Sequence, residues 1–345
     1  MEWQGQAIGI GSLPHKDADE ALELVFKCLP EIPFWPQLPK RDIREGMLAQ
    51  FSENLPFLKM GPEGLAFSGF EAAEGELERF YERIIANDVD YFRISPQHAA
   101  GLHRFYERLK NTDLSAVAAI KCQVTGPFSF CASLKSDKGI TLLHDSVFMQ
   151  AIAKGLMMKA LWQIKLLSEF KKKIIVFVDE PFLASLGSAY TPVNREDVVL
   201  VLGEFCRAIK EAHDVLIGVH CCGNTDWSVL TDIKAIDIIN FDAFTYLDKL
   251  TLYPHDLDKF FRRNGLLCWG IVPTQDFSGQ ETAGILVARI REGIETLAKK
   301  GVDRGQVCER LMVSPACGLG TLDSEKAEGI LRVLSQTSGL LRKSP

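Results

Sequence analysis

The residues best suited to chemistry in this sequence are one histidine and two cysteines from separate segments. His220 and Cys222 lie two positions apart in GVHCCGN, and Cys317 lies much further along the chain in SPACGLG. Imidazole nitrogen and thiolate sulfur are good ligands for zinc. Side chains two positions apart in an extended segment point to the same side, so His220 and Cys222 can face one metal ion while Cys221 points away. We therefore predict a Zn²⁺ site at these residues.

Three carboxylates follow apolar runs and extend this candidate site. Asp242 comes directly after AIDIINF, and its oxygen is a candidate fourth, exchangeable zinc ligand. Asp179 and Glu180 follow KIIVFV in the segment VDEP. Two adjacent carboxylates are costly at the end of an apolar run unless they bind something, so we predict that at least one of them is functional, with a substrate ammonium group as one candidate ligand. The alternative is that one of them only accepts a hydrogen bond from the next loop.

A purely structural role is the alternative for the cysteines, because Cys is among the residue types most often buried. The Cys-Gly at a second predicted strand end and the carboxylate between the two segments favour the metal site. The other cysteines lie in apolar strand-like or helix-like patterns, and we expect them to be core or incidental residues: Cys28, Cys122, Cys131, Cys206, Cys268 and Cys308.

The elements that must position these residues are short apolar runs that alternate with longer segments of helical periodicity. This pattern is typical of parallel strands joined by crossover helices. The predicted strands are residues 7–11, 34–38, 116–124, 173–178, 214–219, 235–241, 265–272 and 310–314. The clearest predicted helices are residues 17–29, 160–173, 194–213, 281–300 and 324–336.

Eight strand candidates that alternate with helices predict one α/β domain over residues 1–345, a single (β/α)8 TIM barrel. The extra length predicts an insertion in the N-terminal third, at residues 40–115. A doubly wound open sheet is the alternative, but Gly9 and Gly11 lack the third glycine of its dinucleotide-binding motif. Active residues of such barrels lie at the carboxyl ends of the strands, where the candidate site residues fall.

Composition and charge restrict the partners. The chain has 345 residues with 39 Lys and Arg against 45 Asp and Glu, a formal net charge of -6. This balance offers no basic surface for nucleic acid and favours a small-molecule substrate. The first residues resemble no signal peptide, no apolar run is long enough to cross a membrane, and the 9 cysteines are an odd number. We expect a soluble cytoplasmic protein with free or metal-bound thiols.

Several short segments, taken in order, resemble the catalytic barrel of cobalamin-independent methionine synthase. They are IGSLPH, TGPFSF, VDEP, HCC, INFD and SPACGLGT, and the match runs from about residue 8 to the end. The resemblance implies a methyltransferase that moves a methyl group to homocysteine, which Ile10, Ser12 and Asp179 would hold, with Glu180 beside Asp179. The implied zinc ligands are His220, Cys222, Asp242 and Cys317.

Four departures from that family bear on the methyl donor. The second, N-terminal barrel of the synthase is absent, and the metal-site Glu of the family is Asp242 here. The strand that carries the proton-donor His of the family ends in Val272 and Pro273, and Ala132 and Ser133 stand where a Trp follows TGP. A folate nitrogen needs a proton to leave, whereas a methyl-corrinoid does not. We therefore predict a methylated corrinoid, carried by a partner protein, as the donor in preference to methyl-folate.

The predicted mechanism is activation of a thiol, whose pKa of about 8.5 falls when zinc binds the sulfur. The thiol would enter an open zinc position or displace Asp242, with Asp179 at its amino end, and these two aspartates are the predicted catalytic residues. HCCGNT also resembles the metal motif of methylcobamide:thiol methyltransferases, and the wider group includes uroporphyrinogen decarboxylase. Coenzyme M as acceptor, a decarboxylase, and a catalytically silent zinc-binding or corrinoid-docking barrel are the alternatives.

Overall fold

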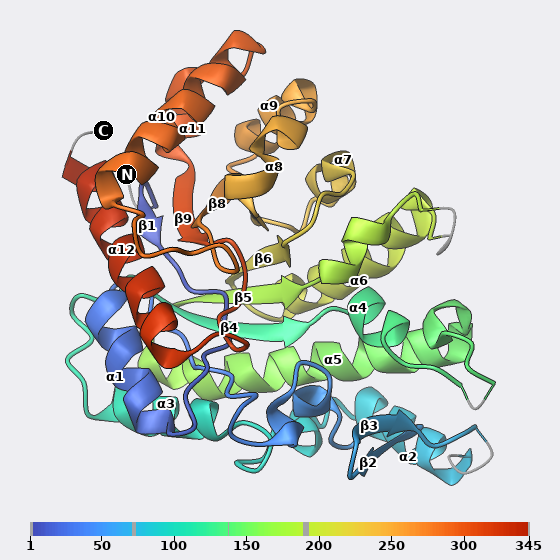
Figure 1. Cartoon of the computed structure of the whole chain (residues 1–345). Coiled ribbons are helices and arrows are strands. Elements are labelled where there is room, and N and C mark those ends of the chain that lie inside the picture. Colours follow the sequence, from blue (N-terminus) through green and yellow to red (C-terminus); the bar gives the residue numbers. More distant parts are fainter. Residues whose placement is uncertain (1–2, 71–73, 137, 189–192, 344–345) are drawn as a thin grey trace.

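The computed structural model describes residues 3–70, 74–136, 138–188 and 193–343. At its centre a seven-stranded parallel sheet curls into most of a barrel, with strand order β1-β9-β8-β7-β6-β5-β4 (Figure 1). The strands are β1 Gln6–Ala7, β4 Ala119–Thr125, β5 Lys173–Asp179, β6 Val215–Cys221, β7 Ile238–Phe241, β8 Leu266–Val272 and β9 Leu311–Pro315. The α/β class and the strands predicted from residue 116 onward are confirmed.

The predicted barrel is incomplete at one position, because residues 34–38 form no regular strand in the structure. This segment makes one isolated bridge to β4 through Phe34 and another to the chain after β1 through Gln37. Pro36 lies between these two bridges, and a proline has no N–H to donate to a neighbouring strand. The segment therefore occupies the place of the eighth strand without the ladder of hydrogen bonds that was predicted.

Helices surround the outer face of the sheet, and every helix that the sequence clearly predicted is confirmed (Figure 1). Asp17, Asn194 and Thr282 cap the first turns of α1, α6 and α10 by accepting backbone N–H groups. Apart from α2, which belongs to the inserted segment described next, the α-helices are α1 Ala18–Cys28, α3 Ala100–Lys110, α4 Pro127–Ala132, α5 Ser146–Leu167, α6 Arg195–Ala212, α7 Trp227–Asp232, α8 Ala243–Leu250, α9 Pro254–Arg262, α10 Ala283–Lys299, α11 Arg304–Glu309 and α12 Ser324–Lys343.

Residues 40–115 contain an antiparallel hairpin, β2 Leu58–Gly61 and β3 Gly64–Phe67, followed by α2 Glu74–Ile85. Aromatic rings fasten the hairpin to α5: the rings of Phe67 and Phe148 meet edge to face with centroids 5.8 Å apart. Thr125 at the end of β4 donates a hydrogen bond of 2.6 Å to the carbonyl oxygen of Met47. These contacts hold the inserted segment against the carboxyl ends of the strands.

Alternate residues of each strand face the inside of the curled sheet. A small buried cluster that includes Ile175, Phe177, Ile238 and Met312 is separate from the larger core beneath the helices. By the period of two, Asp179 lies on the same side of β5 as Phe177. Gly218 leaves room for the Phe177 ring, because a Cβ at this glycine would lie 2.4 Å from it. The interior is thus packed with side chains up to the end where the candidate residues lie.

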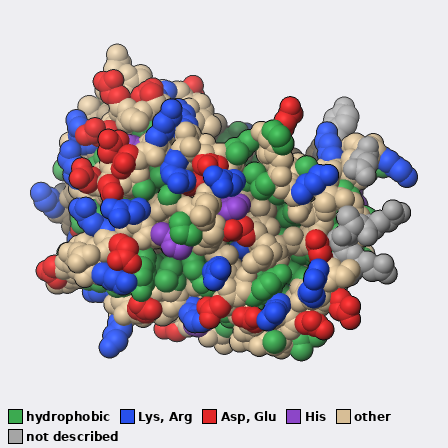
Figure 2. Space-filling model, turned by 90° about the horizontal axis from the view of Figure 1, so that it is seen from below, with side chains coloured by type: hydrophobic (Ala, Val, Ile, Leu, Met, Phe, Trp, Pro, Cys, Tyr) green, Lys and Arg blue, Asp and Glu red, His purple; other side chains and the backbone are tan. Residues whose placement is uncertain are grey.

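In the parts of the chain that the structure describes, the helices are too short or too polar to span a lipid bilayer. Figure 2 shows one face of the molecule, on which basic and acidic side chains lie side by side. No large area of this face carries charge of a single sign.

Candidate metal centre

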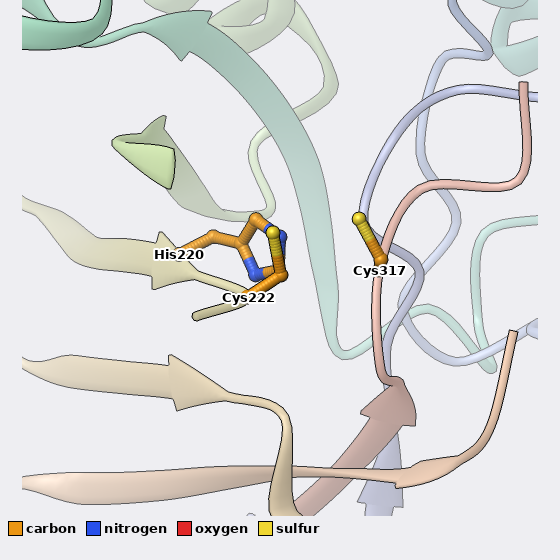
Figure 3. A group of neighbouring side chains, drawn as sticks. All are labelled: His220, Cys222 and Cys317. Carbon is orange, nitrogen blue, oxygen red and sulfur yellow. The ribbon is translucent and has the colours of Figure 1, made fainter. Parts of the chain in front are cut away.

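The structure brings together three of the predicted metal ligands. One ligand atom from each of His220, Cys222 and Cys317 lies within 4.8 Å of the corresponding atoms of the other two. Figure 3 shows the imidazole and the Cys222 thiol side by side, with Cys317 facing them from another segment. Two thiols and an imidazole that converge in this way form a donor set suited to zinc.

The ends of β6 and β9 position these three side chains. His220 is the last but one residue of β6 and pairs in register with Asp179 of β5. Cys222 follows the strand directly, while Cys221 belongs to the outer core and its thiol lies 3.5 Å from the carbonyl oxygen of Gly223. Cys317 lies two residues beyond the end of β9. Because β6 and β9 belong to one curled sheet, their carboxyl ends open at the same side of the molecule.

Proximity of the ligands perturbs their protonation. A hydrogen bond from the Cys317 thiol, together with His220, lowers the pKa of Cys222 to about 4. The same interaction raises the pKa of Cys317, because a thiolate beside it opposes a second negative charge. The two thiols thus oppose each other's ionisation, and the second proton is harder to remove than the first. A metal cation in their midst would stabilise both as thiolates.

Asp242 lies outside this group of close ligand atoms. It is the N-cap residue of α8, and its Oδ1 accepts a hydrogen bond of 2.8 Å from the backbone N–H of Thr245. Burial raises the pKa of Asp242, and the nearby Cys222 thiolate adds to the increase. The described residues therefore bring three candidate ligand side chains together, and the predicted fourth, Asp242, lies outside them with Oδ1 bonded as a helix cap.

A cavity of about 340 Å³ opens beside the three ligands, at the carboxyl ends of the strands. It is lined by Ile10, Gly11, Ser12, Gln37, Pro39, Met47, Asp179, Pro181, His220, Cys222, Gln275, Cys317, Gly318, Gly320 and Thr321. The described lining contains neither Lys nor Arg, and no Phe, Tyr or Trp. Its charged groups are the metal-ligand candidates and one carboxylate.

That carboxylate belongs to Asp179, whose Oδ1 is buried and has no hydrogen-bond partner among the residues that the structure describes. Burial raises the pKa of Asp179 to about 6, although His220 and Lys121 oppose the increase. A buried acceptor without a donor is costly unless a ligand supplies one. The Asp179 carboxyl is therefore prepared for a positively charged or hydrogen-bond-donating group in the cavity.

The turn after β1 forms part of the cavity wall. Lys121 of β4 is fully buried and donates hydrogen bonds to the carbonyl oxygen of Ile10, at 2.5 Å, and to Gln123 Oε1, at 3.0 Å. Ser12 Oγ accepts a hydrogen bond of 3.1 Å from Gly320 N in the loop that carries Cys317. The structure thus places Ile10 and Ser12 beside Asp179, in the cavity where the resemblance implies substrate contacts.

Glu180 is not brought to the cavity. Its side chain is fully buried at the amino end of α4, where it accepts hydrogen bonds from Phe128 N, Ser129 N and Ser129 Oγ at 2.9, 2.8 and 2.6 Å. Burial nevertheless raises the pKa of Glu180 to about 7. In this arrangement Glu180 supports a loop, which is the alternative role considered for one member of the pair.

Asn240 was missed by sequence reasoning. It lies in β7, is fully buried, and places Oδ1 2.5 Å from Nδ1 of His220. The signal was available in AIDIINF, because an amide inside an apolar strand must find buried hydrogen-bond partners. Gln37, Gln275 and Thr321 also line the cavity, but they lie in loops where no local pattern distinguished them.

No protein-family model matches the sequence, and no curated protein matches it. Among solved structures, the fold is similar to a B12-independent methionine synthase from Shewanella sp. W3-18-1, determined in complex with selenomethionine. The TM-score is 0.56 at 16% sequence identity, and the alignment covers 99% of this chain and 98% of that chain. This similarity establishes a shared fold over the length of both chains, while residue roles must be argued from the site.

Proposed function

We propose that this protein is a zinc-dependent methyltransferase that transfers a methyl group to the thiol of homocysteine and forms methionine. The observation that carries the proposal is the position of the His220, Cys222 and Cys317 cluster on the same cavity as the unpartnered carboxyl of Asp179. A thiol that also bears an ammonium group fits both features. The similarity of fold to a methionine synthase agrees with this proposal.

His220, Cys222 and Cys317 would hold the zinc ion, and the donor chemistry of one imidazole and two thiols fits it. Zinc would supply a lowered thiol pKa while leaving the sulfur nucleophilic. Asp179 would bind the substrate ammonium group, and the turn at Ile10 and Ser12 would orient the other end of the amino acid. Asp242 would act as a helix cap beside the site rather than as a permanent ligand.

The charges of the cavity favour homocysteine over the alternative acceptors. Coenzyme M has no ammonium group to meet the Asp179 carboxyl. The several carboxylates of a porphyrinogen need cations, but the described lining has no Lys or Arg. Lys121 lies deeper, with its ammonium hydrogen-bonded to Ile10 and Gln123. An anionic wall at Asp179 suits an amino-acid thiol instead.

The described lining also favours a methyl-corrinoid, carried by a partner protein, over methyl-folate as donor. It contains no Phe, Tyr or Trp ring on which a pterin could stack, and its one imidazole, His220, belongs to the metal-ligand candidates. The strand β8 ends in Val272, and Pro273 follows, so this position supplies no proton to a folate nitrogen. With a methyl-corrinoid, the thiolate sulfur forms a bond to the methyl carbon and the electron pair of the cobalt–carbon bond remains on cobalt.

An assay with two donors and two acceptors tests the proposal. Zinc-loaded protein should form methionine from homocysteine and methylcobalamin, with little product from methyltetrahydrofolate or from coenzyme M. The Cys317→Ser variant is the matched control and should be inactive. Efficient transfer from methyltetrahydrofolate without a corrinoid would overturn the donor assignment. Stoichiometric zinc without transfer from either donor would favour the catalytically silent barrel.

A further inference from the structure

The His220 side chain is held by a buried amide that neither the resemblance nor the fold assigns. Asn240 Oδ1 lies 2.5 Å from His220 Nδ1. The Nδ2 of the same amide donates to the carbonyl oxygen of Cys268 at 3.0 Å and to Ser314 Oγ at 2.8 Å. One fully buried side chain therefore connects β6, β8 and β9 across the interior of the sheet.

The partners of Asn240 determine which way its amide points. The carbonyl oxygen of Cys268 can only accept a hydrogen bond, so the Asn240 group that faces it must be the Nδ2 amide NH₂. Ser314 Oγ donates its proton to the carbonyl oxygen of Pro315 at 2.9 Å, so it accepts from Asn240 as well. Two independent partners thus leave Oδ1 facing the imidazole.

An amide oxygen only accepts hydrogen bonds, so Nδ1 of His220 must carry the proton. The lone pair of the neutral ring is then on Nε2. We propose that Asn240 is a positioning residue that selects this tautomer and fixes the ring, so that His220 presents Nε2 to the metal beside Cys222 and Cys317. The inference deepens the proposed function and rests on it for the identity of the metal.

The same amide links the two halves of the candidate metal centre. His220 lies at the end of β6, and Ser314 lies on β9, three residues before Cys317. A substitution at Asn240 should therefore weaken metal binding mainly by releasing the imidazole ring, and loss of the link to β9 alone should have a small effect. Loss of such an outer hydrogen-bond partner typically weakens metal affinity by about 10- to 100-fold.

The tautomer itself provides a direct test that needs neither a variant nor activity. In a long-range proton–nitrogen NMR spectrum of the zinc-free protein, at an alkaline pH where the imidazole is neutral, His220 should carry its proton on Nδ1. The same nitrogen should remain protonated when zinc is added. A proton on Nε2 can be shared with the nearby Cys222 sulfur, so the decisive atom is Nδ1. An Nδ1 without a proton, in the zinc-free or the zinc-bound protein, would overturn the inference, even if zinc binding and methyl transfer were both found.

Three variants measure the effect on affinity by competition with a chromophoric zinc chelator. Asn240→Leu removes the acceptor and should weaken zinc binding by about 10- to 100-fold. Asn240→Asp keeps an oxygen facing Nδ1 and should recover part of the affinity, while Ser314→Ala leaves the acceptor in place and should change it by less than about threefold. Wild-type affinity in folded Asn240→Leu protein, with unchanged thermal melting, would contradict the proposal. If Asn240→Leu fails to fold, Asn240→Asp and the tautomer measurement still decide it.

Failure of the proposed function can be told apart from failure of this inference. If the protein binds zinc but transfers no methyl group, the tautomer and affinity results still stand. If no zinc binds at all, the proposed function fails, and the zinc-free NMR spectrum alone decides whether Asn240 sets the tautomer.

Discussion

Asp179 and Glu180 are adjacent in sequence, but their carboxyl groups serve different surroundings. Asp179 lines the cavity and has a buried oxygen without a partner in the described structure, whereas both oxygens of Glu180 accept hydrogen bonds at the start of α4. A strand that ends between them explains the difference, because β5 ends at Asp179 and the chain then turns. Substitutions at these neighbours should therefore have separable effects.

Asp179→Asn should impair use of homocysteine with little effect on stability. Loss of the charge that faces the substrate ammonium should lower kcat/KM for homocysteine by about 10- to 100-fold, as expected for one charged hydrogen bond. A thiol without an amino group should react equally with the variant and the wild type. Equal losses for both thiols would contradict a role in binding the ammonium group.

Glu180→Gln should destabilise the fold. An amide offers a single acceptor oxygen, so at least one donor among Phe128 N, Ser129 N and Ser129 Oγ would face an NH₂ group. The expected loss is about 1–3 kcal/mol in the free energy of unfolding, measured by urea denaturation. Unchanged stability with a raised KM for homocysteine would instead return Glu180 to the substrate site.

Buried Lys159 predicts a specific pH dependence of stability. Its Nζ lies in the interior, 3.3 Å from the carbonyl oxygen of Arg93, and burial lowers its pKa to about 7 from 10.5. Between these values the unfolded chain binds more protons than the folded one, so the cost of burying this residue falls, and stability rises, as pH increases from about 7.

The measurement is the difference in unfolding free energy between wild type and Lys159→Met. This difference should change in favour of the wild type by up to about 1.4 kcal/mol per pH unit between about pH 7 and 9. Taking the difference cancels the contributions of other groups, including Lys121, whose pKa burial lowers to about 8. A difference that does not vary with pH would show that Lys159 remains charged in the folded protein.

Lys121→Met should disturb the substrate turn while sparing the metal. The variant loses the hydrogen bond to the Ile10 carbonyl oxygen, so the Ile10 to Ser12 wall of the cavity loses its support from β4. We expect KM for homocysteine to rise by about tenfold with zinc content unchanged, since about 1.4 kcal/mol corresponds to one such hydrogen bond. Loss of zinc in folded variant protein would argue against this separation.

The strand ends and the three clustered ligands could be predicted from sequence for a physical reason. Apolar runs mark buried strands, and a residue type with metal affinity at the end of such a run points into the mouth of a barrel. His220, Cys222 and Cys317 follow this rule. Helices that begin after a clear N-cap residue, such as α6 after Asn194, could be predicted in the same way.

Other features could not be predicted from the sequence, for physical reasons. Asp242 lies one position before a helix, and its Oδ1 accepts the cap hydrogen bond from Thr245, a role that the apolar run before it does not indicate. Its role as a zinc ligand stays a prediction. The apolar character of residues 34–38 predicts a strand, but Pro36 has no N–H to donate to a ladder of strand hydrogen bonds. The Glu180 side chain points to other surroundings than Asp179 because the chain turns after β5, and the sequence periodicity does not predict this turn. The role of Asn240 depends on hydrogen bonds to Cys268 and Ser314 on two other strands, and these partners are too far away in the sequence to be predicted from it.

The central claim is that three protein ligands leave a zinc position open to the substrate thiol. The most direct test is zinc content followed by zinc-edge X-ray absorption spectroscopy, with and without homocysteine, on protein purified without chelator. We expect one zinc per chain, bound by one nitrogen and two sulfur ligands from the protein, with a third sulfur ligand when homocysteine is added. Absence of zinc, or a coordination shell that homocysteine leaves unchanged, would contradict the account.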